Sequence, residues 1–136
     1  MTNKLKIYTD GASRGNPGPA AAAYIFLHGK EIIYKNSLYL GTETNNAAEY
    51  QAILNALGEA HKFSEGVITL YSDSQLIVRQ LNGVYKVKSK NLYPYFKKIQ
   101  NVKKKYKQVI FKHVNRTNKY IQKCDALANE MLDKSI

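Results

Sequence analysis

The sequence lacks acidic residues over a long interval. Residues 74–124 contain no Asp or Glu, although these 51 positions hold 14 of the 21 Lys and Arg residues of the chain. The net charge is +11 and the pI is about 9.7. Such a charge predicts a polyanionic partner, and it favours nucleic acid over an anionic membrane or an acidic protein.

Other absences narrow the class of protein. No apolar run approaches the roughly 20 residues of a membrane-spanning helix, so no membrane is expected. Strand-like sequence begins near Met1, which argues against a signal peptide. The single cysteine, Cys124, excludes an internal disulfide and favours a reducing compartment, so we expect a cytoplasmic protein. A chain of 136 residues fits one domain, residues 1–136.

Apolar periodicity predicts an α/β fold. A period of two gives a strand that ends at Asp10, and two Tyr-containing apolar runs give a hairpin over 20–27 and 31–40. Further strands are predicted over 67–73 and 109–114, and helices over 45–61, 74–83, 92–106 and a last segment that begins near Cys124. This order predicts a five-stranded mixed sheet, with three antiparallel strands and then two parallel ones, and helices on both faces.

Four carboxylates occupy positions that suit a ligand site. Asp10 and Asp73 each end a predicted strand, and ligands bind at the carboxyl ends of adjacent parallel strands. Glu49 lies one turn into the first helix and Asp125 lies in the first turn of the last, so both can point to the same place. Crowded carboxylates repel one another, and a divalent cation removes the repulsion. Oxygen ligands without a His or Cys cluster favour Mg²⁺ or Mn²⁺ over Zn²⁺.

Two such ions, roughly 4 Å apart, can activate a water and stabilise the leaving oxygen of a phosphodiester. Each carboxylate also has an ordinary structural interpretation. Asp10 can start a turn, Asp73 and Asp125 can cap or begin a helix, and Glu49 can be a solvated helix acid. Taken singly, none of the four distinguishes catalysis from these roles.

Four strings in order closely resemble the motif blocks of type 1 ribonuclease H, namely DGASRGNPGPAAAAYI, TNNAAEYQAILNAL, SDSQLIVRQL and KCDALANEM. One string alone would be a weak signal, whereas four in register from Asp10 to Met131 are a strong one. The resemblance implies the ribonuclease H fold. It also implies an endonuclease that hydrolyses the RNA strand of an RNA/DNA hybrid and leaves 5′-phosphate and 3′-hydroxyl ends.

The resemblance implies roles for individual residues. Two Mg²⁺ ions, or Mn²⁺, would be held by Asp10, Glu49, Asp73 and Asp125. Positions that meet 2′-hydroxyls of the RNA are Gly11, Ser13 and Asn16, and small polar groups suit that contact. Positions that touch phosphates or base edges are Thr44, Asn45, Asn46 and Gln75. For Asn45 and Asn46, helix capping is the alternative role.

The basic interval resembles a DNA-strand binding region. Alternating lysines at 86, 88 and 90 can follow phosphates, and the family's DNA-phosphate pocket corresponds to Lys88 and Ser89, with Asn91 as the alternative to Ser89. The segment 73–92 is too short for the basic helix and loop of long ribonucleases H, so the chain resembles the compact subtype. It contains no Trp, and stacking therefore falls to tyrosines. The lysines at 103–105 are predicted to form a solvated helix face.

Two residues compete for a role in product release. Long ribonucleases H place a mobile histidine before the last carboxylate, and the corresponding histidine here, His113, lies in a predicted strand. Arg116 occupies about the position at which compact relatives use arginine. We predict that Arg116 has this role.

Two other functions compete with hybrid cleavage. A catalytically silent nucleic-acid binding module is disfavoured because all four carboxylates are present. Another nuclease of the superfamily, such as an integrase-like strand transferase or a Holliday-junction resolvase, is disfavoured by the strings DGASRGNPGP and TNNAAEY. No obligate protein partner is indicated, and we expect a monomer.

Overall fold

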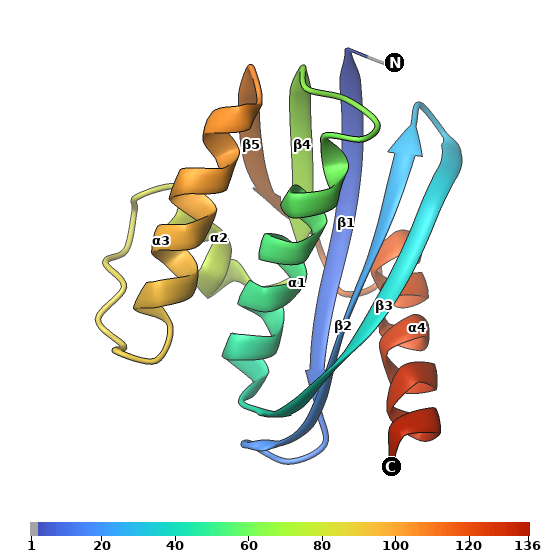
Figure 1. Ribbon diagram of the computed structural model, residues 1–136, viewed down its shortest axis with the longest axis vertical. Helices are drawn as coiled ribbons and strands as arrows, with labels where there is room; N and C mark the ends of the chain where they lie inside the picture. Colours follow the sequence, from blue (N-terminus) through green and yellow to red (C-terminus); the bar gives the residue numbers. More distant parts are fainter. Residues whose placement is uncertain (1–2) are drawn as a thin grey trace.

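One five-stranded sheet forms the centre of the molecule, with the strand order β3-β2-β1-β4-β5 (Figure 1). The computed structural model describes residues 3–136. The strands are β1 (Lys4–Ser13), β2 (Gly18–His28), β3 (Glu31–Glu43), β4 (Val67–Ser72) and β5 (Gln108–His113). The first three pair antiparallel, whereas β4 pairs parallel with both β1 and β5. The predicted mixed sheet is confirmed.

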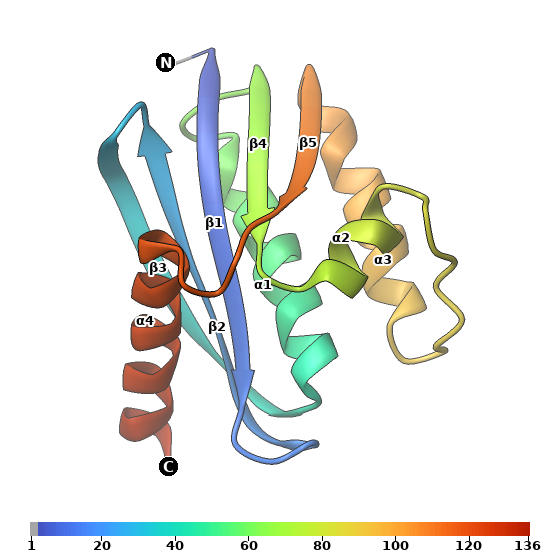
Figure 2. The ribbon, with the colours of Figure 1, turned by 180° about the vertical axis from the view of Figure 1, so that it is seen from behind.

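Helices cover both faces of the sheet, as predicted (Figures 1 and 2). The helices are α1 (Asn45–Ala60), α2 (Gln75–Leu81), α3 (Tyr93–Val102) and α4 (Lys119–Ser135). One hydrophobic cluster joins the sheet to α1, α2 and α3, and a second joins the opposite face to α4. Within residues 3–136, no helix has the length and apolar character needed to span a membrane.

Small residues bring α1 close to the sheet. Ala48, Ala52, Ala56 and Ala60, which recur every fourth position, are all fully buried. At the closest approach, a Cβ atom on Gly11 of β1 would lie 2.3 Å from the Ala48 carbonyl carbon. Only glycine fits there, because real Cβ atoms do not approach backbone atoms so closely. This close approach sets the distance between α1 and β1.

Several predicted boundaries were wrong. Strand β3, for example, ends at Glu43 and not at residue 40. Strand β1 continues past Asp10 to Ser13, because its antiparallel pairing with β2 extends beyond its parallel pairing with β4, which ends at Tyr8. Helix α4 begins at Lys119, well before Cys124, because the Asn118 side chain accepts hydrogen bonds from the first turn. The predicted helix 92–106 ends at Val102 and continues as the 3₁₀ turn Lys103–Lys105, a tightening that is common at helix ends.

Candidate active site

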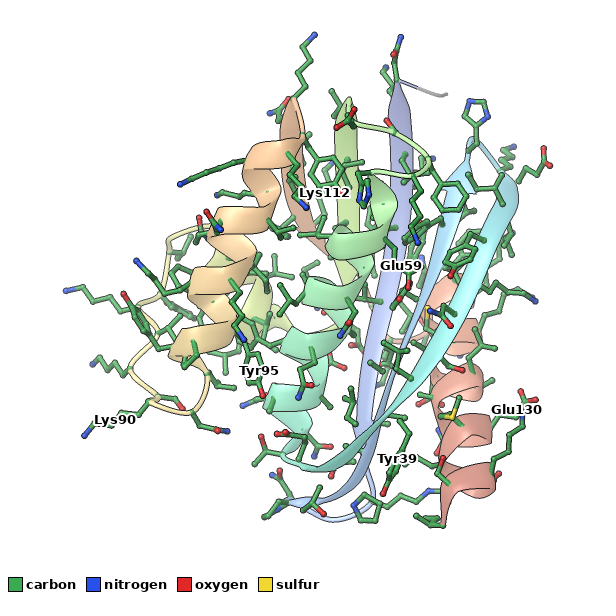
Figure 3. All side chains as sticks on the ribbon, in the orientation of Figure 1. Tyr39, Glu59, Lys90, Tyr95, Lys112 and Glu130 are labelled. Atoms are coloured by element: carbon green, nitrogen blue, oxygen red, sulfur yellow. The ribbon has the colours of Figure 1, made fainter. Side chains whose placement is uncertain are left out.

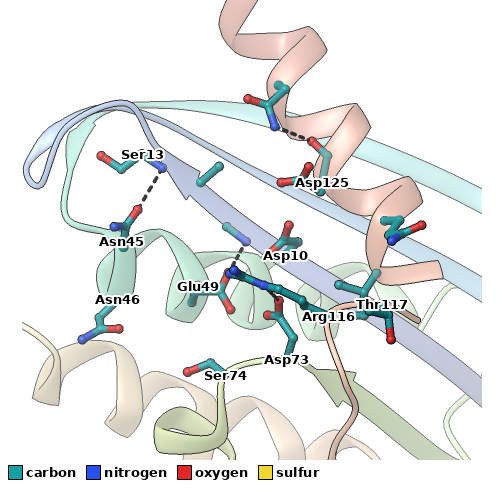
Figure 4. Close-up of a pocket in the computed structure, with 15 residues that line it drawn as sticks. Asp10, Ser13, Asn45, Asn46, Glu49, Asp73, Ser74, Arg116, Thr117 and Asp125 are labelled. Atoms are coloured by element: carbon teal, nitrogen blue, oxygen red, sulfur yellow. Dashed lines mark hydrogen bonds and ion pairs between the residues drawn. The ribbon is translucent and has the colours of Figure 1, made fainter. Parts of the chain in front are cut away.

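Three carboxylates from three different elements meet at one point. Asp10 comes from β1, Glu49 from α1, and Asp73 directly follows β4. A ligand oxygen from each lies within 4.8 Å of the others, and Figure 4 shows the three side chains converging. Because β1 and β4 are adjacent and parallel, the fold brings Asp10 and Asp73 together as the sequence predicted.

Glu49 is held in place by hydrogen bonds to both carboxylate oxygens. The Gly11 backbone N–H donates to Oε1 at 2.5 Å, and the Ser72 hydroxyl donates to Oε2 at 3.4 Å. Ser72 also accepts a hydrogen bond from the Ser74 N–H at 3.1 Å. Glu49 is buried, with 8% of its surface exposed, so it is not a solvated helix acid. Sequence reasoning missed Ser72, although a polar residue directly before Asp73 was a usable signal.

Burial changes the protonation of the site. Burial, together with the negative charges of Asp73 and Asp125, raises the pKa of Asp10 to about 7. Burial also raises the pKa of Glu49 well above its ordinary value, and the charge of Asp10 acts in the same direction. Without a cation, the site therefore favours protons on its inner carboxyls. A divalent ion relieves the same repulsion by replacing these protons.

Asp125 lies at the edge of the triad. It lines the same cleft, of about 870 Å³, and its charge acts on Asp10, but it lies outside the set of three close carboxylates. Since α4 begins at Lys119, Asp125 sits in the second helical turn and is neither a cap nor a first-turn acid. The cleft is also lined by three polar residues that sequence reasoning missed, Thr117, Gln122 and Asn129. The only signal for them in the sequence was their position close to Arg116 and Asp125.

Arg116, and not His113, reaches the carboxylates. Arg116 lines the cleft, and its Nε lies 3.9 Å from Oδ2 of Asp73, while 85% of its side chain remains exposed (Figure 4). His113 is the last residue of β5 and does not line the cleft. A long, exposed side chain with a weak ion pair can move at little cost. This suits the predicted role in product release.

The predicted RNA-binding residues gather where the β1–β2 loop meets α1. The Ser13 N–H donates to Oδ1 of Asn45 at 3.1 Å, and the Asn45 N–H donates to Oδ1 of Asn16 at 3.0 Å. Gly11, Ser13, Asn45 and Asn46 line the cleft. Thr44 caps α1 through a bond from the Ala47 N–H, which settles that neither asparagine is the cap.

Five predicted substrate residues do not line the cleft. Asn16 and Thr44 adjoin the lining residue Asn45, and the other three are Gln75, Lys88 and Ser89. Gln75 begins α2, and its neighbour Ser74 lines the cleft in its place. Lys88 and Ser89 are exposed and lie in the segment 82–92 that joins α2 to α3. This segment contains no helix, as the compact subtype predicts. Ser89 accepts a hydrogen bond from the Leu92 N–H at 3.3 Å, so it helps to start α3.

Tyr85, at the beginning of this segment, is one of the tyrosines to which the sequence assigned stacking, but its pairing with Arg79 was not predicted. The Arg79 guanidinium donates to the Tyr85 hydroxyl at 2.7 Å and lies 5.4 Å from the centre of its ring. Both groups are held in place beside a lysine-rich loop. Lys90, farther along the loop, points away from the body of the molecule (Figure 3). The segment therefore presents an aromatic ring and several cations to solvent.

Comparison with known proteins agrees with this geometry. The RNase H family model matches residues 2–135. Ribonuclease HI of Halobacterium salinarum is 37% identical over 131 residues, which cover 96% of this chain and 65% of that protein. Its crystal structure superposes with a TM-score of 0.91 at 36% identity, covering 96% of this chain and 98% of the solved one.

A second solved structure is LC11-RNase H1 in complex with an RNA/DNA hybrid. It is 37% identical, with a TM-score of 0.91, and the match covers 96% of this chain and 98% of that one. The chain thus spans less than two thirds of the halobacterial protein's full length but almost all of each solved domain. By its sequence and its fold, the chain belongs to the RNase H family.

Proposed function

We propose that the protein is a metal-dependent endoribonuclease that hydrolyses the RNA strand of RNA/DNA hybrids, leaving 5′-phosphate and 3′-hydroxyl ends. The observation that carries this proposal is the close triad of Asp10, Glu49 and Asp73 in an open cleft, with Asp10 and Glu49 buried. Membership of the RNase H family supports it, and so does the similarity to an RNase H1 that was solved with a hybrid.

The donor set fits divalent cations. All three close ligands are carboxylates, which suit Mg²⁺ or Mn²⁺, and we propose Mg²⁺. One ion would be held by the triad, and a second by Asp10 together with Asp125. When bound, such ions activate a water and stabilise the leaving oxygen of a phosphodiester. The hydrogen bonds from Gly11 and Ser72 keep Glu49 in one orientation for this task.

The remaining residues in and around the cleft bind and orient the substrate. Ser13, Asn16 and Asn45 form a hydrogen-bonded rim of small polar groups, which suits recognition of 2′-hydroxyls. Arg116 places a positive charge beside Asp73, where it can accompany the phosphate product out of the site. The lysines of segment 82–92 would hold phosphates of the DNA strand.

Substrate choice tests the proposal. We expect the wild-type protein to cut a labelled hybrid in Mg²⁺ roughly a thousandfold faster than a DNA duplex of the same sequence, because a site built to bond a hydroxyl rejects an analogue without it. Chelation of the metal should stop the reaction. Binding without cutting would favour the silent module, and equal cutting of hybrid and DNA duplex would favour another superfamily nuclease.

Salt dependence tests the DNA-strand contacts. Replacing all three of Lys86, Lys88 and Lys90 by Ala should weaken hybrid binding roughly tenfold. The slope of log affinity against log salt should become less steep by about one for each phosphate that is no longer neutralised. The matched control replaces the lysines of the 3₁₀ turn Lys103–Lys105, at the opposite end of α3 (Figure 1). It changes the net charge equally. Equal weakening by both variants would contradict a positioned contact.

A further inference from the structure

The β1–β2 loop forms hydrogen bonds with two helices, α1 on one side and α4 on the other. On one side, Asn45 of α1 bonds with Ser13 and Asn16, as described above. On the other side, Arg14 reaches α4, where its Nη2 donates to Oδ1 of Asp133 at 2.6 Å and to the Asn129 carbonyl oxygen at 3.2 Å. The loop therefore bridges α1 and α4, two of the elements that border the cleft.

The backbone of Arg14 is itself fixed. Its N–H donates to the Pro19 carbonyl at 2.8 Å, which closes the loop. Gly18 packs against the Arg14 carbonyl so closely that a Cβ atom there would lie 2.4 Å from the oxygen. A side chain anchored on such a loop transmits the position of the loop to whatever it holds. Here it holds the C-terminal half of α4.

The hydrogen-bond partners of Arg14 connect it with the cleft. Asn129 lines it, and its Nδ2 donates to the Asp125 carbonyl oxygen at 3.0 Å one turn earlier in α4. The bonds from Arg14 thus join the loop that carries Ser13 and Asn16 to the helix that carries Asp125. These groups would have to engage one stretch of RNA together. Their separation depends on how α4 sits against the loop.

We propose that Arg14 is a positioning residue that sets this separation through its hydrogen bonds with Asp133 and Asn129. The inference rests on the proposed function, since its effect is on hybrid binding. Without these bonds the loop and α4 can move apart, so the hybrid must restore their arrangement when it binds. The expected result is a higher KM with an unchanged kcat, because the bound hybrid restores the position of α4 and Asp125 before the chemical step, and the triad makes no contact with Arg14.

Direct contact between Arg14 and an RNA phosphate is the competing explanation. In the structure the Arg14 guanidinium is already paired with a carboxylate, and 37% of its side chain is exposed. The two explanations differ in what Asp133 does. If Arg14 binds phosphate, removing Asp133 frees a cation and strengthens binding. If Arg14 positions α4, the same change weakens binding even though the protein becomes more positive.

Steady-state kinetics on a labelled hybrid in Mg²⁺ separate these cases. Arg14→Ala and Asp133→Ala should each raise KM about threefold to fivefold, the range of an exposed ion pair, with kcat within twofold of wild type. The exchanged pair, Arg14→Asp with Asp133→Arg, should recover most of the loss. In neither single variant should the slope of log affinity against log salt change by about one, which is the change expected when one phosphate contact is lost. Lys134→Ala, which removes a cation from the same end of α4, is the control and should keep KM.

The possible failures are distinguishable. A wild-type protein that cuts hybrid while Asp133→Ala keeps or lowers KM would overturn the positioning role alone. So would a drop of about one in the salt slope of Arg14→Ala, which indicates a phosphate contact. A wild-type protein that leaves every hybrid intact would overturn the proposed function, and this inference with it.

Discussion

Asp10→Asn is expected to abolish hybrid cleavage and, at the same time, to make the metal-free protein more stable. Bound metal contributes several kcal/mol to stabilising the reacting phosphate, which corresponds to a loss of about a thousandfold or more in rate. Asp10 belongs to the close triad, and an amide cannot replace its charge. Asp73→Asn should lose activity for the same reason.

The gain in stability follows from the pKa of Asp10. Its folded pKa is about 7, against an ordinary value of 3.8, so the folded state holds a proton that the unfolded state releases. This contribution to stability is fully present below pH 4 and is lost as pH rises through 7. Asn imitates the protonated form at every pH. At pH 8 the gain is on the order of 4 kcal/mol, because folding raises the pKa of Asp10 from 3.8 to about 7 and a rise of one corresponds to about 1.4 kcal/mol.

Thermal unfolding with and without Mg²⁺ checks both effects. Without metal, Asp10→Asn should melt above wild type at pH 8, and the two should converge near pH 4. Added Mg²⁺ should raise the melting temperature of wild type more than that of the variant. Glu130→Gln, a change at an exposed acid on α4 (Figure 3), should alter neither activity nor melting. A variant that cuts hybrid at the wild-type rate would contradict the metal mechanism.

Gly11→Ala is expected to destabilise the protein more than any other addition of a single methyl group near the site. The new Cβ atom would lie 2.3 Å from the Ala48 carbonyl carbon and 2.4 Å from the Glu49 nitrogen. These are backbone atoms of α1, so no side chain can turn aside and the helix itself must move. Overpacking of this kind costs about 3 kcal/mol or more. The same movement breaks the hydrogen bond from Gly11 to the Glu49 carboxylate.

Gly58→Ala is the matched control for this prediction. Gly58 lies exposed in the same helix, and a Cβ atom there would meet no heavy atom within 4 Å. Because Ala favours a helix over Gly, this variant should gain up to about 1 kcal/mol. Chemical denaturation measures both changes, and Gly11→Ala should also lose hybrid cleavage. Equal stability of the two alanine variants would refute the close approach of α1 to β1.

The sequence was sufficient for the topology but not for the contacts that refine the site. Alternating apolar residues and the order of strands and helices predicted the sheet, and the motif strings located Asp10, Glu49 and Asp73. The start of α4 was misplaced, because the polar residues before Cys124 hide the helix that Asn118 caps. No local sequence pattern predicts which groups will form hydrogen bonds across long sequence separations.

Two hydrogen bonds at or near the site join residues that lie far apart in the sequence. The bond from Gly11 to Glu49 joins residues 38 positions apart, and that from Arg14 to Asp133 joins residues 119 positions apart. Lys88, which the family pattern assigns to the DNA strand, lies on a loop outside the cleft, and its phosphate contact stays a prediction. Such placements depend on how the elements pack, which no short string encodes.

The place of Asp125 on α4 has a consequence for protein synthesis. Asp125 follows Asp10 by 115 positions, and all five strands precede it in the chain. Because a ribosome releases the N-terminal part first, a nascent chain can acquire its sheet and its inner triad before the helix that carries Asp125 emerges. Under the proposed function, the growing polypeptide would not cleave nearby RNA until α4 has been synthesised.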